Sequence, residues 1–383
     1  MDIYGVCQCF EKRYGKSYRI FSAPGRINLI GEHTDYNDGY VFPGAIDMAV
    51  NLAINPTQTS IVRLYAIDLN EEVEFDLVDK EISLPSWAYY PFGVVQELQK
   101  MCGEVTGFDA VFGGNIPLGA GLSSSAALES AFAFALNETN QLGLSKEKLA
   151  RIGQLSEHNY VGVKCGIMDQ FASLFGKENQ FIRLDCRDLS YEMVQFIPNG
   201  YTLLLADTGV KHSLASSEYN TRRIQCEEGV KIISRQFSSI VNLRDVNLDM
   251  MKDVRSLLNP IVYNRCEYVV EENMRVMETT EALKANDMTR LGQLIYSSHA
   301  GLSRKYEVSC IELDTLVEVA KESPYVAGAR MMGGGFGGCT LNLIEENSIE
   351  EFKERANLSF NKTFGRKPTY IKVSISAGAR EIK

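Results

Sequence analysis

The sequence predicts an α+β protein with two domains, and three observations support this prediction. The chain has 383 residues, enough for two domains at ~100–200 residues each. Short strands fill much of the first half, whereas helical patterns dominate after Ser217, so the order is not a regular βαβα alternation. A turn cluster at 198–200 precedes a strongly apolar strand, and we therefore expect domains at 1–198 and 199–383.

The first half begins with a helical pattern, in which Ile3, Val6 and Phe10 recur at helical spacing. Short extended segments with turn residues between them follow, and then amphipathic or apolar helices. The elements expected in chain order are a helix to Tyr14, extended segments at 18–30, 49–54, 60–65 and 72–77, a helix at 86–100 with Ser86 as its N-cap, a strand at 108–112, a loop at 115–125, an Ala/Leu/Phe-rich helix at 126–136, and a helix at 146–160 capped by Ser145.

The second half begins with strand patterns and is mainly helical. Expected strands at 181–184 and 202–206 come before helices at 218–237, 261–277, 288–304 and 311–322. A strand at 341–344, a helix at 349–360 and a strand at 370–375 are expected to close the chain.

The composition argues against several classes of protein. Thirty-nine Lys and Arg against forty-nine Asp and Glu give a formal charge of −10, which disfavours a general nucleic-acid or anionic-membrane binder. The sequence contains no run of ~18 apolar residues, so no transmembrane helix is expected. No signal peptide is visible, and we therefore expect a cytoplasmic protein. The nine cysteines are scattered without a CxxC pair, which disfavours a disulfide framework or a zinc site.

The first polar cluster lies in PGRINLIGEHTDYNDG, residues 24–39. Glu32, His33 and Asp35 fall within four residues, beside glycines and Arg26. One interpretation is a solvated turn with ordinary charges. The other is a polyol site, whose acceptors and histidine bind sugar hydroxyls and reject analogues that would leave buried polar groups unpaired.

The second motif is PLGAGLSSSAA, residues 117–127. Two glycines let backbone N–H groups approach an anion closely, and three serines follow at the expected start of a helix, where unpaired N–H groups favour a phosphate. The motif is neither a Walker A loop nor a Rossmann fingerprint. The structural alternative is a serine-capped core helix with a flexible segment before it.

The third motif is RMMGGGFGGC, residues 330–339. Five glycines in six residues have a high entropic cost, which close packing against another loop or a ligand would explain. A flexible turn is the alternative, and Met331 and Met332 are interpreted as core residues.

Two isolated carboxylates complete the set of candidates. Asp169 lies in the apolar segment CGIMDQF, residues 165–171, and is either a cap or ion-pair residue or a general base kept ionised by a nearby cation. Glu157, on the preceding helix, is either a surface charge or a hard oxygen ligand for Mg²⁺.

Together these segments resemble the galactokinases of the GHMP kinase superfamily. The segment at 24–39 is similar to the galactokinase signature, 117–127 to the superfamily's phosphate loop, 165–171 to the segment that carries the base, and 330–339 to the C-terminal glycine motif. SEYNTRR, at 217–223, also resembles a sugar-contact segment. The motifs occur in the family's order and span nearly the whole chain. GEHTDY together with CGIMDQ is the most specific match and implies galactose as substrate.

The resemblance implies an ATP-dependent transfer of phosphate to the C1 hydroxyl of D-galactose, which gives galactose 1-phosphate and ADP in the Leloir pathway. Asp169 would take the hydroxyl proton, while Arg26 would keep Asp169 ionised and stabilise charge in the transition state. The implied sugar pocket comprises Glu32, His33, Thr34, Asp35, Gly166, Asp169 and Tyr219. The implied ATP site comprises Gly119, Ala120, Gly121, Leu122, Ser123, Ser124 and Ser125, with Trp87 near the adenine. Ser125 and Glu157 would hold Mg²⁺.

The resemblance also implies the fold, an α+β arrangement of two lobes with the active site in the cleft between them. The N-terminal lobe would be similar to domain 2 of ribosomal protein S5, and the C-terminal lobe would contain a ferredoxin-like sheet. The expected partners are galactose and ATP, with no nucleic acid and no membrane. A monomer is expected, with a dimer as the alternative.

The sequence departs from the family pattern at three positions, which bear on specificity or affinity. Met332 replaces a usual Thr, Asn220 a usual Pro, and Tyr89 a common Asn. Two alternatives to a galactokinase stay open, a kinase for a related sugar such as N-acetylgalactosamine and a non-catalytic sugar and ATP sensor. The intact phosphate loop, together with Asp169 and Arg26, argues against the sensor.

Overall fold

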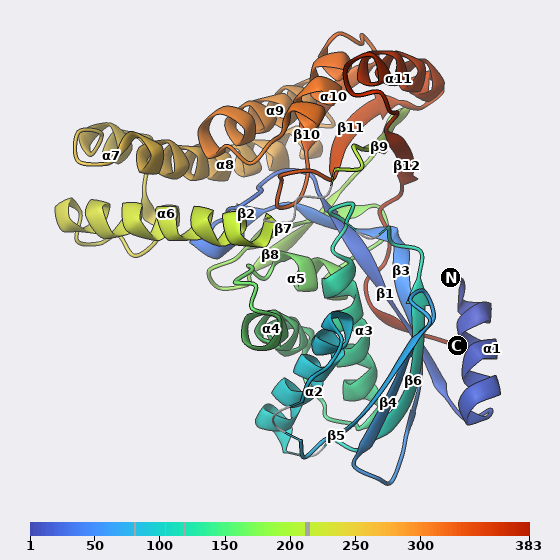
Figure 1. Cartoon of the computed structure of the whole chain (residues 1–383). Coiled ribbons are helices and arrows are strands. Elements are labelled where there is room, and N and C mark those ends of the chain that lie inside the picture. Colours follow the sequence, from blue (N-terminus) through green and yellow to red (C-terminus); the bar gives the residue numbers. More distant parts are fainter. Residues whose placement is uncertain (80–81, 104, 118, 211–214) are drawn as a thin grey trace.

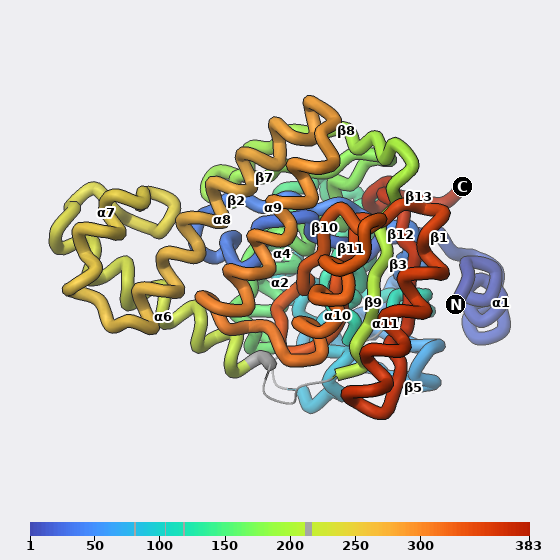
Figure 2. The backbone as a smooth tube through the Cα atoms, turned by 90° about the horizontal axis from the view of Figure 1, so that it is seen from above, coloured from blue at the N-terminus to red at the C-terminus, as the bar shows by residue number. Residues whose placement is uncertain are grey.

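The computed structural model describes residues 1–79, 82–103, 105–117, 119–210 and 215–383. Figure 1 shows two lobes, a lower one built on a large sheet and an upper one in which helices cover a smaller sheet. A helical arm extends to one side and is formed by α6 (Ala215–Gln236), α7 (Leu248–Asp253) and α8 (Pro260–Lys284). The view from above in Figure 2 shows that this arm projects well beyond the rest of the molecule.

The lower lobe contains a six-stranded sheet of order β13-β1-β3-β6-β4-β5, in which only β4 and β6 pair in parallel. Helix α1 covers one face, where Val6 and Phe10 pack on Ala53, Tyr65 and Val111, and helices α2 to α5 cover the other. The bounds are α1 Ile3–Tyr14, β1 Arg19–Asn28, β3 Pro43–Pro56, β4 Ile61–Ala66, β5 Glu71–Asp76, α2 Tyr89–Cys102, β6 Phe108–Gly114, α3 Ser124–Thr139, α4 Lys146–Ser156, α5 Met168–Phe175 and β13 Arg380–Ile382.

Two further sheets connect the lobes and build the upper one. A three-stranded sheet has the order β2-β7-β8, and a four-stranded antiparallel sheet has the order β10-β11-β9-β12. Their strands are β2 Tyr40–Val41, β7 Gln180–Asp185, β8 Tyr191–Gln195, β9 Tyr201–Asp207, β10 Val326–Met331, β11 Cys339–Glu345 and β12 Thr369–Val373. The helices of this half are α6 Ala215–Gln236, α7 Leu248–Asp253, α8 Pro260–Lys284, α9 Met288–Gly301, α10 Ile311–Lys321 and α11 Ile349–Phe364.

The chain crosses between the lobes more than once. The turn at 198–200 lies between β8 and β9, which belong to different sheets. The last strand, β13, returns to pair with β1, and both ends of the chain lie on the same side of the molecule (Figures 1 and 2). The division into domains at residue 198 stays a prediction.

Most expected elements are confirmed to within a few residues, and the differences are local. The expectation that Ser86 caps a helix is wrong, because the chain first makes a 3₁₀ turn at Ser86–Ala88 and α2 begins at Tyr89. Ser145 does occupy the cap position of α4, but its side chain makes no capping hydrogen bond. The helix expected at 146–160 changes to a π-helical turn at Glu157–Val161. In the part of the chain that the structure describes, no helix is long and apolar enough to cross a membrane.

Candidate active site

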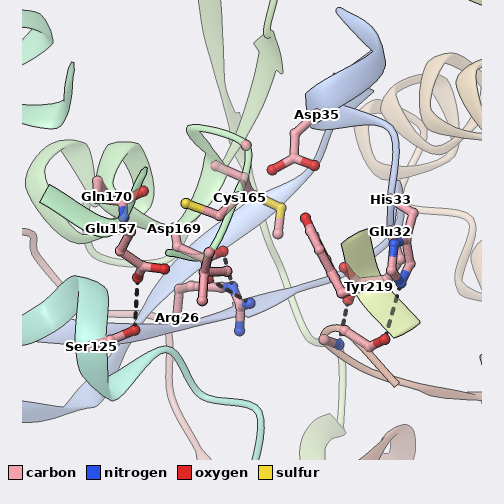
Figure 3. Close-up of a pocket in the computed structure, with 15 residues that line it drawn as sticks. Arg26, Glu32, His33, Asp35, Ser125, Glu157, Cys165, Asp169, Gln170 and Tyr219 are labelled. Atoms are coloured by element: carbon pink, nitrogen blue, oxygen red, sulfur yellow. Dashed lines mark hydrogen bonds and ion pairs between the residues drawn. The ribbon is translucent and has the colours of Figure 1, made fainter. Parts of the chain in front are cut away.

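Every charged residue of the predicted sugar pocket lines one cavity of about 160 Å³, where parts of both lobes meet. Figure 3 shows these side chains, which come from β1 and the turn after it, from α3, from 157–170, and from two segments of the second half. The lining residues are Arg26, Glu32, His33, Asp35, Ser125, Glu157, Val163, Cys165, Gly166, Met168, Asp169, Gln170, Tyr219, Gly333 and Gly334.

Asp169 and Arg26 form a bidentate ion pair in this cavity. Arg26 Nε lies 2.8 Å from Asp169 Oδ1 and Nη2 lies 3.0 Å from Oδ2. Burial lowers the pKa of Arg26, but the charges of Asp169 and Glu32 outweigh burial and raise the pKa overall. Arg26 Nη1 also donates to the carbonyl of Gly121, at 2.5 Å. One guanidinium therefore contacts both the candidate base and the phosphate loop.

Ser123 contacts the same carboxylate from the phosphate loop. It stands at the N-cap position of α3 with a φ of 57°, and its hydroxyl makes no capping bond. Ser123 Oγ donates instead to Asp169 Oδ2, at 2.5 Å. The interpretation of this segment as a serine-capped helix is therefore wrong for Ser123, whose hydroxyl faces the candidate base.

Asp35 and Gly166 face one another across the pocket. A Cβ added to Gly166 would lie 1.9 Å from Asp35 Oδ2, so a side chain at 166 would displace the carboxylate. Burial, and then the charges of Asp169 and Glu32, raise the pKa of Asp35 to about 7. Asp35 therefore changes its charge near neutral pH.

His33 lines the cavity with both ring nitrogens already bonded within the protein. Nδ1 lies 2.7 Å from the Tyr36 hydroxyl and Nε2 lies 3.2 Å from the Gly334 carbonyl. A carbonyl only accepts, so Nε2 carries the proton and Nδ1 accepts from Tyr36. Burial lowers the pKa of His33 to about 3, so the ring is neutral. Tyr219 packs against this ring, with centroids 5.1 Å apart.

Thr34 does not line the cavity. Its hydroxyl lies 2.9 Å from the Gly31 carbonyl and 2.6 Å from the Tyr40 carbonyl, and the residue is fully buried. Its contacts stabilise the turn that presents Glu32 and Asp35, and the structure does not bring it together with the other predicted sugar ligands.

The phosphate loop leads into α3 beside the cavity. Gly119 and Gly121 have φ values of 81° and 75°, which side-chain-bearing residues rarely adopt. Ala120 and Leu122 are buried, which leaves the serines facing the pocket side. Ser124 begins α3, so the first turn of the helix presents N–H groups there. Leu118 of the motif lies outside the described residues.

A second cavity of about 410 Å³ lies beside the first, and Ser125 lines both. Apolar side chains dominate it, including Trp87, Phe112 and Leu128. Trp87 donates from Nε1 to Glu71 at 2.6 Å and packs on Phe112 with centroids 5.6 Å apart. A flat apolar ring is the kind of group that such a pocket accepts.

Ser125 and Glu157 are the two oxygen groups that suit a divalent cation. Ser125 Oγ lies 3.0 Å from Glu157 Oε1. Burial, and then the charge of Asp169, raise the pKa of Glu157 to about 7, so the buried carboxylate has too little positive charge around it. No cluster of three His, Cys, Asp or Glu forms a complete metal site in the described residues. A hydroxyl and a carboxylate are hard oxygen donors, so the chemistry of this pair fits Mg²⁺, which takes few protein ligands and completes its coordination with phosphates and water.

Sequence reasoning gave no role to Arg330, Cys165 or Gln170. Cys165 and Gln170 line the cavity, and Arg330 lies behind it with no exposed side-chain surface. Arg330 begins the glycine motif, and a charged residue next to two apolar methionines and a run of glycines is the signal that could have singled it out. Cys165 and Gln170 flank predicted site residues but carry no such signal.

Comparison with known proteins shows which family the chain is similar to. Three family descriptions match: the galactokinase galactose-binding signature at 8–56, the N-terminal domain of the GHMP kinases at 89–177, and their C-terminal domain at 279–362. The galactokinase of Chloroflexus aggregans is 44% identical over 92% of this chain and 90% of its own length. That of Thermosipho africanus is 43% identical over 94% of this chain and 99% of its own.

Solved structures of kinases also resemble this chain. The crystal structure of Lactococcus lactis galactokinase complexed with galactose has a TM-score of 0.95 and 33% identity, and covers 99% of both chains. The mevalonate kinase of Methanococcus jannaschii has a TM-score of 0.66 and 18% identity over 94% of this chain, which shows the fold alone. The fold is thus the two-domain α+β fold of the GHMP kinases, and the chain belongs to the galactokinase family.

Proposed function

We propose that this chain transfers the terminal phosphoryl group of ATP to the C1 hydroxyl of D-galactose, giving galactose 1-phosphate and ADP. The observation that carries the proposal is the Asp169–Arg26 pair, which lies between the polar pocket and the loop that faces the second cavity. The galactokinase of Lactococcus lactis, 33% identical to this chain, was solved with galactose, which supports the choice of sugar.

In the proposed reaction the sugar hydroxyl oxygen forms a bond to the terminal phosphorus, and the bond from that phosphorus to the bridging oxygen of ATP breaks. Asp169 orients the hydroxyl and receives its proton. Arg26 keeps Asp169 ionised and stabilises negative charge on the transferred group. Such transfers depend on in-line positioning and charge stabilisation more than on covalent chemistry by the protein.

The sugar occupies the polar cavity. Glu32 and Asp35 accept hydrogen bonds from its hydroxyls, and Gly166 leaves room for it. His33 and Tyr219 form an aromatic wall. Because both His33 nitrogens have protein partners, we infer that it acts through its ring face and through the glycine motif, and that it offers no free nitrogen to a hydroxyl.

The nucleotide occupies the second cavity, with its phosphates on the loop Gly119–Ser125. Trp87 and the apolar wall receive the adenine, and the N–H groups at the start of α3 bind phosphate oxygens. Ser125 and Glu157 hold Mg²⁺. When bound, this ion neutralises charge on the phosphates. The monomeric state and the cytoplasmic location stay predictions.

One assay tests the reaction. Release of ADP is measured by enzyme coupling with galactose, glucose, N-acetylgalactosamine or mevalonate, each with and without Mg²⁺. The proposal expects release that requires both galactose and Mg²⁺. A preference for N-acetylgalactosamine would make the protein a kinase for that sugar, and binding of galactose without ADP release would make it a sensor.

A further inference from the structure

Arg330 crosses from β10 into the turn that carries the sugar signature. Its side chain has no exposed surface, and its guanidinium bonds four acceptors. Nε donates to the Leu29 carbonyl at 2.9 Å, and Nη1 donates to the Met331 carbonyl at 3.0 Å. Nη2 donates to the Asn28 carbonyl and to Glu32 Oε1, the latter at 3.0 Å.

The Glu32 carboxylate is held from one side only. Oε1 accepts from both Arg330 and the backbone N–H of Gly333, the latter at 2.8 Å. Among the described residues no protein donor bonds Oε2, although Glu32 lines the cavity (Figure 3). Since Oε1 is occupied on the protein side, Oε2 is the oxygen that remains for a ligand hydroxyl.

The burial of Glu32 also calls for its ion pair with Arg330. Glu32 is 2% exposed, and burying a carboxylate is costly unless a group of opposite charge pairs with it. Arg26 also lies near, but its bidentate contact is with Asp169. Arg330 is the cation in salt-bridge contact with Glu32 among the described residues. A lysine would carry the charge but could not reach four separated acceptors from one nitrogen.

We propose that Arg330 is a positioning residue for galactose recognition, which fixes the Glu32 carboxylate so that Oε2 accepts a hydrogen bond from a sugar hydroxyl. The role rests on the proposed function, because the sugar is the ligand that Oε2 meets. In this role Arg330, the first residue of the C-terminal glycine motif, helps to shape the sugar pocket. It lies 298 positions from Glu32 in the sequence.

The first test compares steady-state kinetics of Arg330→Lys with those of the wild-type protein. Truncating one partner of a buried, hydrogen-bonded charge pair commonly weakens binding by about 30-fold or more, and Lys restores part of the contact. We expect the galactose KM to rise about tenfold or more, with the ATP KM changed by less than about twofold.

Arg265→Lys is the matched control. The Arg265 side chain is 3% exposed and bonds Gln225 and Glu307, which do not line the sugar cavity. This variant alters an equally buried guanidinium, whose charged partner Glu307 is 58% exposed, and should leave the galactose KM unchanged. A galactose KM that is unchanged in folded Arg330→Lys, or raised equally in the control, overturns the proposal.

Calorimetric binding of galactose supplies a second readout, in a cycle of Arg330→Lys, Glu32→Gln and the double variant. If Arg330 acts through Glu32, the double variant loses little more affinity than Glu32→Gln alone. Fully additive losses would overturn the proposal. A wild-type protein that binds galactose but releases no ADP would refute the proposed reaction and leave the binding test of Arg330 intact.

Discussion

At the level of single residues, Asp169 is held by more contacts than an isolated acid in an apolar segment would suggest. Arg26 bonds both of its oxygens, and Ser123 adds a third donor from the phosphate loop. These contacts fix the carboxylate in one orientation before substrates bind, which is what positioning catalysis requires. They also connect the candidate base directly to the loop that we assign to ATP.

Replacing Asp169 with alanine should abolish turnover while galactose binding survives. Loss of a positioned base commonly lowers kcat by ~10²–10⁴. Coupled ADP release measures kcat, and calorimetry with galactose shows whether the pocket remains intact. A variant that keeps substantial turnover would show that Asp169 is not the base.

Replacing Glu157 with glutamine should raise the Mg²⁺ concentration needed for half-maximal activity, because an amide oxygen lacks the charge that a hard cation prefers. The measurement is a metal titration of ADP release. Glu97→Gln is a suitable control, since Glu97 is also a buried glutamate of the same lobe but bonds Lys100 and Asn159. If the Glu157→Gln titration is the same as that of the control, Glu157 is not a ligand.

The pH dependence of galactose binding should follow Asp35, whose pKa burial and the charges of Asp169 and Glu32 raise to about 7. Above that pH the carboxylate is ionised and accepts a hydroxyl hydrogen bond, and below it the added proton removes the charge. The galactose KM should therefore rise as the pH falls below about 7, measured with ATP and Mg²⁺ saturating. In Asp35→Asn the KM should be raised at every pH, without that inflection. A wild-type KM that is flat across this range would be inconsistent with the assignment.

At the level of elements, the glycine motif is a turn whose backbone conformation favours glycine at most of its positions. Gly333, Gly335, Gly337 and Gly338 all have positive φ values, which explains most of the five glycines without invoking flexibility. The turn packs on the phosphate loop, since a Cβ at Gly338 would lie 3.6 Å from Ala120. The close packing that the sequence predicted for this motif is confirmed, and the flexible turn was the wrong alternative.

Two glycine-to-alanine variants can separate the cost of a left-handed backbone conformation from the cost of a steric clash at the added Cβ. Gly335 and Gly365 have φ values of 86° and 68°, but a Cβ at Gly335 would meet the Val308 carbonyl at 2.2 Å, whereas nothing lies within 4 Å at Gly365. Gly365→Ala should cost roughly 1–2 kcal/mol of unfolding free energy from the left-handed conformation alone. Gly335→Ala should cost clearly more, as measured by urea denaturation. Equal losses would mean that the motif can shift to make room.

The elements that the sequence did not predict depend on tertiary contacts. β10 reads VAGARM, which has little intrinsic strand preference. It forms because it pairs with β11 and because Gly292 of α9 lets the backbones approach, since a Cβ there would lie 1.8 Å from the Ala327 carbonyl. The resemblance to the galactokinases implied which residues meet in the site, and most of them line one cavity. It could not show that Thr34 turns away or that Arg330 faces Glu32, because those directions depend on how the lobes pack.

At the level of the whole molecule, the two ends of the chain stabilise each other. β13 pairs with β1, the strand that carries Arg26, and Arg19 bonds Glu381 through two nitrogens at 2.7 and 2.8 Å. The lower lobe therefore depends on the last residues of the chain, which a division by sequence position would assign to the other lobe.

Deleting residues 380–383 should lower the melting temperature by a few degrees, because β1 becomes an edge strand and Arg19 loses its partner. Differential scanning calorimetry measures the change. Lys383→Ala, which leaves β13 in place, is the control and should melt like the parent protein. Coincident melting of the deletion variant and the control would show that β13 adds nothing to the sheet.

The contact between Arg330 and Glu32 has a consequence for redesigning which hexose the protein accepts. A mutant library directed at the ligand-facing carboxylates would cover the segment that carries them, residues 24–39. Arg330, on the distant strand β10, sets the orientation of the Glu32 carboxylate. Changing residues 24–39 alone therefore leaves that constraint in place. Selections that randomise position 330 together with Glu32 should reach sugar preferences that neither position yields by itself.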